Sequence, residues 1–174
     1  MKKIILVTGG QRSGKSRWAE QEALHYSPTP LYVATARIGD DEFRHRVALH
    51  RARRGPEWSL AEEPEALDRV PVAAGQTVLV DSVTMWCTNL FFAAGEDADK
   101  ALERFRELFD RFTEPEATYL FVTDEIGLGG ISAQALQRRF ADLLGTVNQY
   151  IAARADRVVL LVSGLPVEVK PFVK

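Results

Sequence analysis

Short, uninterrupted apolar runs recur along the chain, and longer amphipathic segments separate most of them. Because these runs show no polar alternation, they are typical of parallel strands buried on both faces of a sheet. Strands are therefore predicted at Ile4–Val7, Leu31–Ala34, Thr77–Val80, Thr118–Val122 and Arg157–Val162. Weaker candidates are Trp58–Ala61 and Pro166–Val169, the second folded back beside the last central strand.

The segments between these runs have the residue spacing of helices. The clearest example places Leu102, Phe105, Phe109 and Phe112 on one stripe. Alternating strands and helices predict an α/β fold with a mainly parallel sheet and helices on both faces. Without a linker or an internal repeat, we expect residues 1–174 to form a single domain. The predicted helices are Lys15–Tyr26, Asp40–Arg54, Thr84–Phe92, Ala98–Phe112 and Ala133–Arg154.

A glycine-rich loop joins the first predicted strand to the first predicted helix. It matches the phosphate-loop pattern G-x-x-x-x-G-K-[S/T] at every fixed position. In such loops, backbone N–H groups and the helix N-terminus surround phosphate oxygens, the lysine reaches the β- and γ-phosphates, and the last hydroxyl binds Mg²⁺. The position between strand and helix argues against a chance match, so we predict a nucleoside-triphosphate site. Its residues are Gly9, Gly10, Gln11, Arg12, Ser13, Gly14, Lys15 and Ser16.

The metal of a phosphate loop usually needs a carboxylate as well as the hydroxyl of Ser16. Asp81, at the end of the strand Thr77–Val80, is the first candidate, although an acidic residue there often only caps the next helix. Asp124 and Glu125 are the alternative, either through a water molecule or as a base. The loop leaves kinase, ATPase, GTPase switch and nucleotidyltransferase open, but the chain lacks the Asn-Lys-x-Asp run of switch GTPases.

The predicted helix Asp40–Arg54 is rich in arginine and contains His50. Phe43 and Val47 share one helical face with His50, so the imidazole is predicted to point toward the protein body. Neighbouring guanidinium groups favour a neutral imidazole, which is a competent nucleophile toward phosphorus. From the residues alone, a structural histidine is nevertheless the favoured interpretation, because isolated histidines are common.

Composition limits the partners that we expect. The formal net charge of −2 provides no basic field for non-specific nucleic-acid binding. A single cysteine excludes an internal disulfide and a thiolate-rich metal site. No apolar stretch approaches the ~20 residues of a membrane span. We therefore predict no nucleic-acid partner, no membrane span and a cytoplasmic location.

Several motifs occur together along nearly the whole chain. Besides the loop Val7–Ser16 they are Tyr32-Val-Ala-Thr-Ala36, Arg46-(x)₃-His50-Arg51, Asp81-Ser-Val-Thr-Met-Trp86 and Thr123-Asp-Glu-Ile-Gly127. In combination they resemble the bifunctional adenosylcobinamide kinase/adenosylcobinamide-phosphate guanylyltransferases of cobalamin biosynthesis. Asp124 stands where asparagine is commoner in that family.

The resemblance implies a RecA-like fold and a homotrimer. It implies phosphorylation of adenosylcobinamide, then transfer of GMP from GTP to adenosylcobinamide phosphate, giving adenosylcobinamide-GDP and pyrophosphate; GTP or ATP is the phosphoryl donor. It makes His50 the guanylylated residue, which reverses the structural interpretation above. The nucleotide contacts that it implies are the loop Gly9–Ser16 with catalytic Lys15, and Ala34, Thr35, Ala36, Arg51, Ala52, Arg53, Arg54, Glu62 and Asp81.

Two other functions remain open on the sequence. One is a plain small-molecule kinase in which His50 is structural. The other is a non-catalytic module that is switched by a nucleotide. The homotrimer is also favoured by an apolar set that is expected to be exposed, namely Met85, Trp86, Phe91 and Phe92.

Overall fold

The computed structural model describes residues 1–37 and 54–172. Its strands form one seven-stranded sheet in the order β3-β2-β4-β5-β1-β6-β7. All neighbouring strands are parallel except β6 and β7, which form an antiparallel hairpin. The strands are β1 (Lys3–Gly9), β2 (Leu31–Ala34), β3 (Ser59–Glu62), β4 (Thr77–Asp81), β5 (Thr118–Val122), β6 (Arg157–Val162) and β7 (Leu165–Lys170).

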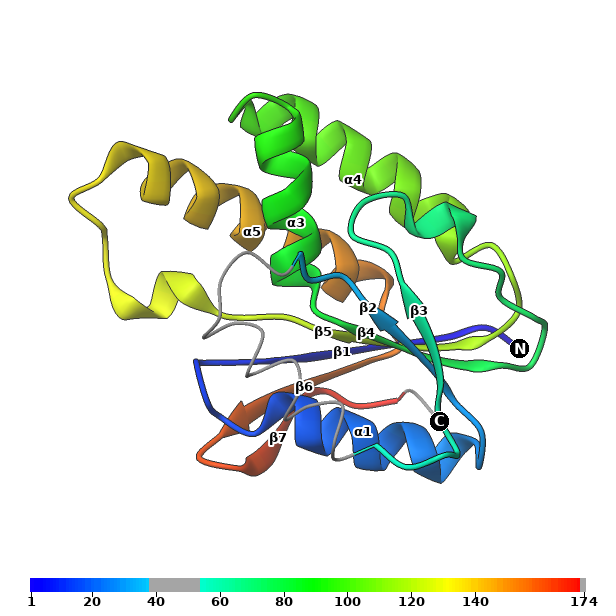
Figure 1. The fold of residues 1–174 in the computed structure, drawn as a ribbon. Coiled ribbons are helices and arrows are strands. Elements are labelled where there is room, and N and C mark those ends of the chain that lie inside the picture. The colour runs from blue at the N-terminus through cyan, green and yellow to red at the C-terminus, as the bar shows by residue number, and fades with distance from the viewer. Residues whose placement is uncertain (38–53, 173–174) are drawn as a thin grey trace.

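Helices cover both faces of the sheet (Figure 1). Helix α1 lies on one face, and α3, α4 and α5 lie on the other. Two short 3-10 turns, η1 and η2, complete the described elements. Their bounds are α1 (Lys15–Tyr26), α3 (Val83–Ala93), α4 (Ala98–Phe112), α5 (Ala135–Arg154), η1 (Leu67–Arg69) and η2 (Ile126–Gly129).

The central strand β1 shows why the apolar runs lack polar alternation. Its side chains alternate between two hydrophobic clusters, because successive residues of a strand point to opposite faces. Ile5 and Val7 pack in the cluster that contains Ala19 and Ala23 of α1. Ile4 and Leu6 pack in the larger cluster formed with α3, α4 and α5. Both faces of the strand are therefore apolar.

The strands and most helices agree with the sequence-based prediction to within one or two residues. Arg54, predicted as the last residue of a helix from Asp40, lies in no helix, and Gly55-Pro56 follows it directly. The rest of that predicted helix, residues 40–53, lies outside the described residues.

The apolar set on and around α3 is largely buried, which corrects the expectation of an exposed patch. Trp86 and Phe91 are 0% and 1% exposed, whereas Phe92 is exposed and Met85 is half-buried. Trp86 packs on Phe105 of α4 with ring centroids 4.5 Å apart, and its indole N–H donates to the carbonyl of Glu65. Helix α3 packs against α4 and α5 on the same face of the sheet, and this packing buries Trp86 and Phe91.

Candidate nucleotide site at the phosphate loop

The loop Gly9–Ser16 connects the carboxyl end of β1 to α1, and its backbone conformation depends on glycine. Gly14, the residue before α1, has φ +94°, a left-handed value that glycine adopts without strain. A Cβ at Gly9 would come within 2.6 Å of the carbonyl oxygen of Leu161, so only glycine fits there. The N–H of Gly164, in the β6–β7 turn, donates to the carbonyl of Ser13. The loop is thus fitted closely against β6 and the turn that follows it.

Lys15 begins α1 and lies inside the loop. Its ammonium group donates to the carbonyl of Gly10 at 2.7 Å and pairs with Oδ1 of Asp124 at 2.7 Å. The side chain is only 9% exposed. The ammonium group thus lies at the loop, where the phosphate-loop pattern predicts a contact with bound phosphate.

Asp124 and Glu125 follow β5, the strand between β1 and β4. Oδ2 of Asp124 accepts a hydrogen bond from the hydroxyl of Thr84, and the amide of Asn148 donates to the backbone carbonyl of Asp124. Glu125 accepts from the hydroxyl of Thr8 at 2.8 Å. Thr8, Thr84 and Asn148 were not predicted as site residues from the sequence. One signal in the sequence was Asn148, a polar residue beside Val147 on the apolar face of the predicted helix Ala133–Arg154.

The register of the sheet aligns three of the predicted contacts. Ala34 on β2 pairs with Glu62 on β3 and with Asp81 on β4, so these residues form one row across three strands. Because the strands are parallel, this row lies at the same edge of the sheet as the phosphate loop. Glu62 is exposed there, whereas Thr35, the residue after Ala34, is buried. The Thr35 hydroxyl donates to the carbonyl of Ser82 at 2.7 Å, which joins the 34–36 segment to the end of β4.

Asp81 is the last residue of β4, and Ser82, not Asp81, caps the next helix. The side chain of Ser82 accepts from the N–H of Met85 at the start of α3. Asp81 instead accepts a hydrogen bond from the hydroxyl of Tyr32 at 3.0 Å. Burial and the adjacent Asp81 raise the pKa of Tyr32 well above its ordinary value, so the hydroxyl keeps the proton that it donates.

Ser16 and Asp81 have the chemistry that a magnesium site requires. A hydroxyl and a carboxylate are hard oxygen donors, and α1, which carries Ser16, packs against β4, which ends at Asp81. Across residues 1–37 and 54–172, no group of three or more His, Cys, Asp or Glu side chains forms a complete metal cage.

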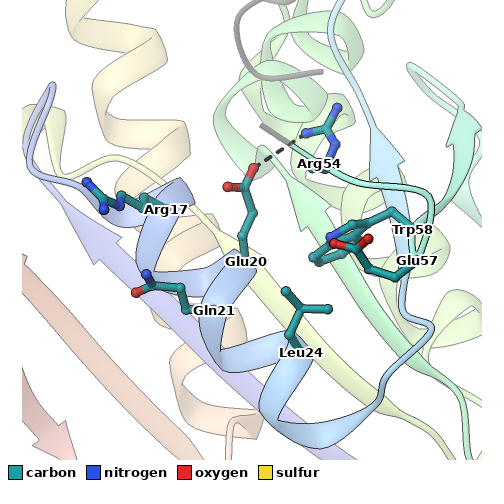
Figure 2. Close-up of a pocket in the computed structure, with 7 residues that line it drawn as sticks. All are labelled: Arg17, Glu20, Gln21, Leu24, Arg54, Glu57 and Trp58. Atoms are coloured by element: carbon teal, nitrogen blue, oxygen red, sulfur yellow. Dashed lines mark ion pairs between the residues drawn. The ribbon is translucent and has the colours of Figure 1, made fainter. Parts of the chain in front are cut away.

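Arg54 is tightly packed beside α1 (Figure 2). Its guanidinium carbon lies 3.5 Å from the ring centroid of Tyr32, and Nη1 lies 3.5 Å from Oε1 of Glu20. The Arg54 and Glu20 side chains are 8% and 10% exposed. Trp58 packs edge-to-face with Tyr32, and their ring centroids are 6.0 Å apart. Tyr32 therefore contacts both the predicted nucleotide-binding arginine and the predicted metal-binding aspartate.

A small pocket of about 170 Å³ adjoins this cluster, between α1 and the segment that follows Arg54. Arg17, Gln21 and Leu24 line it from α1, and Glu57 and Trp58 line it from the other side (Figure 2). Of the predicted site residues, His50, Arg51, Ala52 and Arg53 lie outside the described part of the chain. The rest are distributed between the loop, the row at the sheet edge and Arg54.

Comparison with known proteins assigns the chain to a family. A family model described as cobinamide kinase / cobinamide phosphate guanyltransferase matches residues 5–169. The chain belongs to this family. The family is the one that the sequence motifs resemble, and the expected enzyme class, a bifunctional kinase and guanylyltransferase, is confirmed.

Curated relatives are similar to the chain over nearly their full length. The chain is 41% identical over 169 residues to the bifunctional adenosylcobalamin biosynthesis protein CobP of Pseudomonas aeruginosa, covering 95% of this chain and 96% of that protein. It is 39% identical over 181 residues to the protein CobU of Salmonella typhimurium, which carries the same description, covering 96% and 99%.

The solved structures show the fold alone. An ATPase from the type III secretion system of pathogenic bacteria aligns with a TM-score of 0.55 and 12% identity, over 95% of this chain and 56% of that chain. The predicted RecA-like phosphate-loop fold is confirmed. None of the helices in the described ranges is both long and apolar enough to cross a membrane.

Proposed function

We propose that the chain phosphorylates adenosylcobinamide and then transfers GMP from GTP to adenosylcobinamide phosphate. The products of the second reaction are adenosylcobinamide-GDP and pyrophosphate. The observation that carries this proposal is the phosphate loop Gly9–Ser16, with Lys15 nearly buried inside it, in a chain of the cobinamide kinase and guanyltransferase family.

Both reactions use the loop to hold the β- and γ-phosphates. Lys15 and the backbone N–H groups neutralise negative charge that increases on the leaving phosphates, which is the main electrostatic contribution of such loops. Ser16 and Asp81 would hold Mg²⁺, which would neutralise further charge on the same phosphates. In the kinase reaction, the substrate hydroxyl attacks the γ-phosphorus of GTP or ATP, the bond to the β-phosphate breaks, and the hydroxyl proton leaves.

Guanylyl transfer requires reaction at the α-phosphorus instead. We assign this step to His50 on the sequence evidence. A neutral imidazole nitrogen forms a bond to the α-phosphorus of GTP while the bond to pyrophosphate breaks. A phosphate oxygen of adenosylcobinamide phosphate then attacks the same phosphorus and displaces the histidine. Arg51–Arg54 and Glu62 are the proposed contacts to the nucleotide.

The decisive experiment combines adenosylcobinamide, unlabelled ATP and α-labelled GTP with the purified protein. The proposal requires multiple turnovers that place the label in adenosylcobinamide-GDP, and a labelled protein when no acceptor is present. If unlabelled adenosylcobinamide phosphate is the only product, the protein is a plain kinase. Nucleotide binding without any turnover would identify a nucleotide-switched module. Either result would contradict the proposed function.

Tyr32→Phe is expected to weaken Mg²⁺ binding by about tenfold, the lower end of the effect of losing a group that orients a metal ligand. The change removes the hydroxyl that donates to Asp81 and retains the ring on which Arg54 packs. A calorimetric titration of Mg²⁺ into protein with bound GDP measures this affinity directly.

Tyr150→Phe is the matched control, because the Tyr150 hydroxyl also donates to an aspartate, Asp110, at the surface between α4 and α5. It should leave the Mg²⁺ affinity unchanged. Equal Mg²⁺ affinity in the wild type and Tyr32→Phe would mean that Asp81 is not positioned by this hydrogen bond.

We also propose a homotrimer, as the resemblance implies, and a cytoplasmic location, as the composition suggests. The edge strand β7 offers a surface of a suitable kind, since Leu165, Val167 and Val169 are exposed along it. Light scattering at micromolar concentration should give about three times the 19.4 kDa of one chain. A monomeric mass under these conditions would refute the trimer.

A further inference from the structure

Lys15 and Asp124 form an ion pair inside the phosphate-loop site. Their charged atoms are 2.7 Å apart, and the Lys15 ammonium group also donates to the carbonyl of Gly10 at 2.7 Å. The lysine side chain is 9% exposed and the aspartate side chain 29%, so water screens this pair less than a pair at the surface. The chain itself thus supplies two oxygen partners to the ammonium group that is expected to bind phosphate.

The Asp124 carboxylate is held in its position by neighbouring elements. Its second oxygen accepts from the Thr84 hydroxyl at 2.8 Å, and the Thr84 oxygen accepts from the Asp124 N–H at 3.0 Å. Asn148 of α5 donates to the Asp124 carbonyl at 3.1 Å. Thr84 lies in the first turn of α3, where the helix dipole favours an anion. Moving the carboxylate away from Lys15 would break its hydrogen bond with the Thr84 hydroxyl.

We propose that Asp124 is a positioning residue that competes with phosphate oxygens for Lys15 and thereby limits how tightly the loop holds pyrophosphate. The inference rests on the proposed function, in which the loop binds the β- and γ-phosphates. A phosphate oxygen must draw the ammonium group away from Asp124 or share it with the carboxylate. The two anions also repel each other at this short range. Both effects weaken the binding of polyphosphate.

Competition for Lys15 affects the release of pyrophosphate during guanylyl transfer. Pyrophosphate is the leaving group of the first step, and it is held by the same Lys15 that bound the triphosphate. An internal carboxylate that can take Lys15 back favours pyrophosphate release over the reverse reaction. Asp124 therefore acts on binding and release through Lys15, without contact to the reacting phosphorus.

The test is the affinity of the full-length protein for inorganic pyrophosphate without divalent metal, measured by calorimetry. Asp124→Asn keeps the size of the side chain and an oxygen that accepts from Thr84, but it removes the charge. We expect pyrophosphate to bind about tenfold more tightly, which corresponds to about 1.4 kcal/mol. Glu125→Gln is the charge-matched control. It removes one negative charge at the next residue, whose carboxylate accepts from Thr8, and should change the affinity by less than about twofold.

Unchanged or weaker pyrophosphate binding in Asp124→Asn overturns the inference, and so does equal tightening in Glu125→Gln, which would indicate a general charge effect. Thr84→Val is a second variant, because it keeps the Asp124 charge and removes the hydroxyl that anchors the carboxylate. We expect it to increase the affinity for pyrophosphate by less than Asp124→Asn does. An unchanged affinity in Thr84→Val would count against the inference. Lys15→Ala distinguishes a failure of the proposed function from a failure of the inference about Asp124. If it binds pyrophosphate like the wild type, the proposed function of the loop fails, whereas lost binding in Lys15→Ala with unchanged Asp124→Asn defeats the inference alone.

Discussion

Lys15→Ala is expected to abolish both the kinase and the guanylyl-transfer reaction while leaving the fold intact. The ammonium group lies at the loop that is proposed to hold the phosphates, so the substitution removes a positive charge from that site. Loss of one such preorganised contact costs about 2.7–4 kcal/mol of transition-state stabilisation, a decrease in kcat of about 10²–10³. Initial rates with each acceptor, together with thermal unfolding curves, test the prediction.

Lys170→Ala provides a control for the loss of a half-buried lysine. Lys170 also donates to backbone carbonyls, those of Ala152 and Ala155 at the end of α5, and it belongs to β7, an edge strand. It should retain both reactions. Near wild-type turnover of Lys15→Ala with either acceptor would show that the loop is not the catalytic cradle for that reaction.

His50→Ala is expected to lower guanylyl transfer by at least about 10³-fold and to leave the kinase reaction in place, because Lys15, Ser16 and Asp81 are unchanged. The covalent adduct supplies a direct measurement. Protein labelled by α-labelled GTP should lose the label in acid and keep it in base, as a phosphoramidate does. Label from γ-labelled GTP should be absent, since pyrophosphate leaves in the first step.

His25→Ala is the matched control, since His25 is an exposed histidine in the last turn of α1. It should form the adduct as the wild type does. Should His50→Ala retain guanylyl transfer at an unchanged rate, GMP transfer would have to be direct, and the covalent mechanism would be wrong.

The loop and the strands could be predicted because their signals are local. The G-x-x-x-x-G-K-[S/T] pattern encodes backbone conformations that glycine alone adopts easily, as Gly9 and Gly14 show. Continuous apolar runs occur where a strand is buried on both faces, which holds for β1, β4 and β5. These features depend on a few consecutive residues, so they can be predicted without knowledge of the rest of the chain.

The amino-acid sequence by itself determined that this protein is an α/β enzyme with a phosphate loop, and its motifs indicated the family. Only the tertiary structure decided which carboxylate meets Lys15. Asp81 ends β4 and Asp124 comes soon after β5. Because β5 lies between β1 and β4, Asp124 forms the ion pair and Asp81 accepts from Tyr32 instead. The burial of Trp86 under α4 was decided at the same level. Strand order and helix packing join residues that are tens of positions apart, and such long-range contacts leave no periodic signal along the chain.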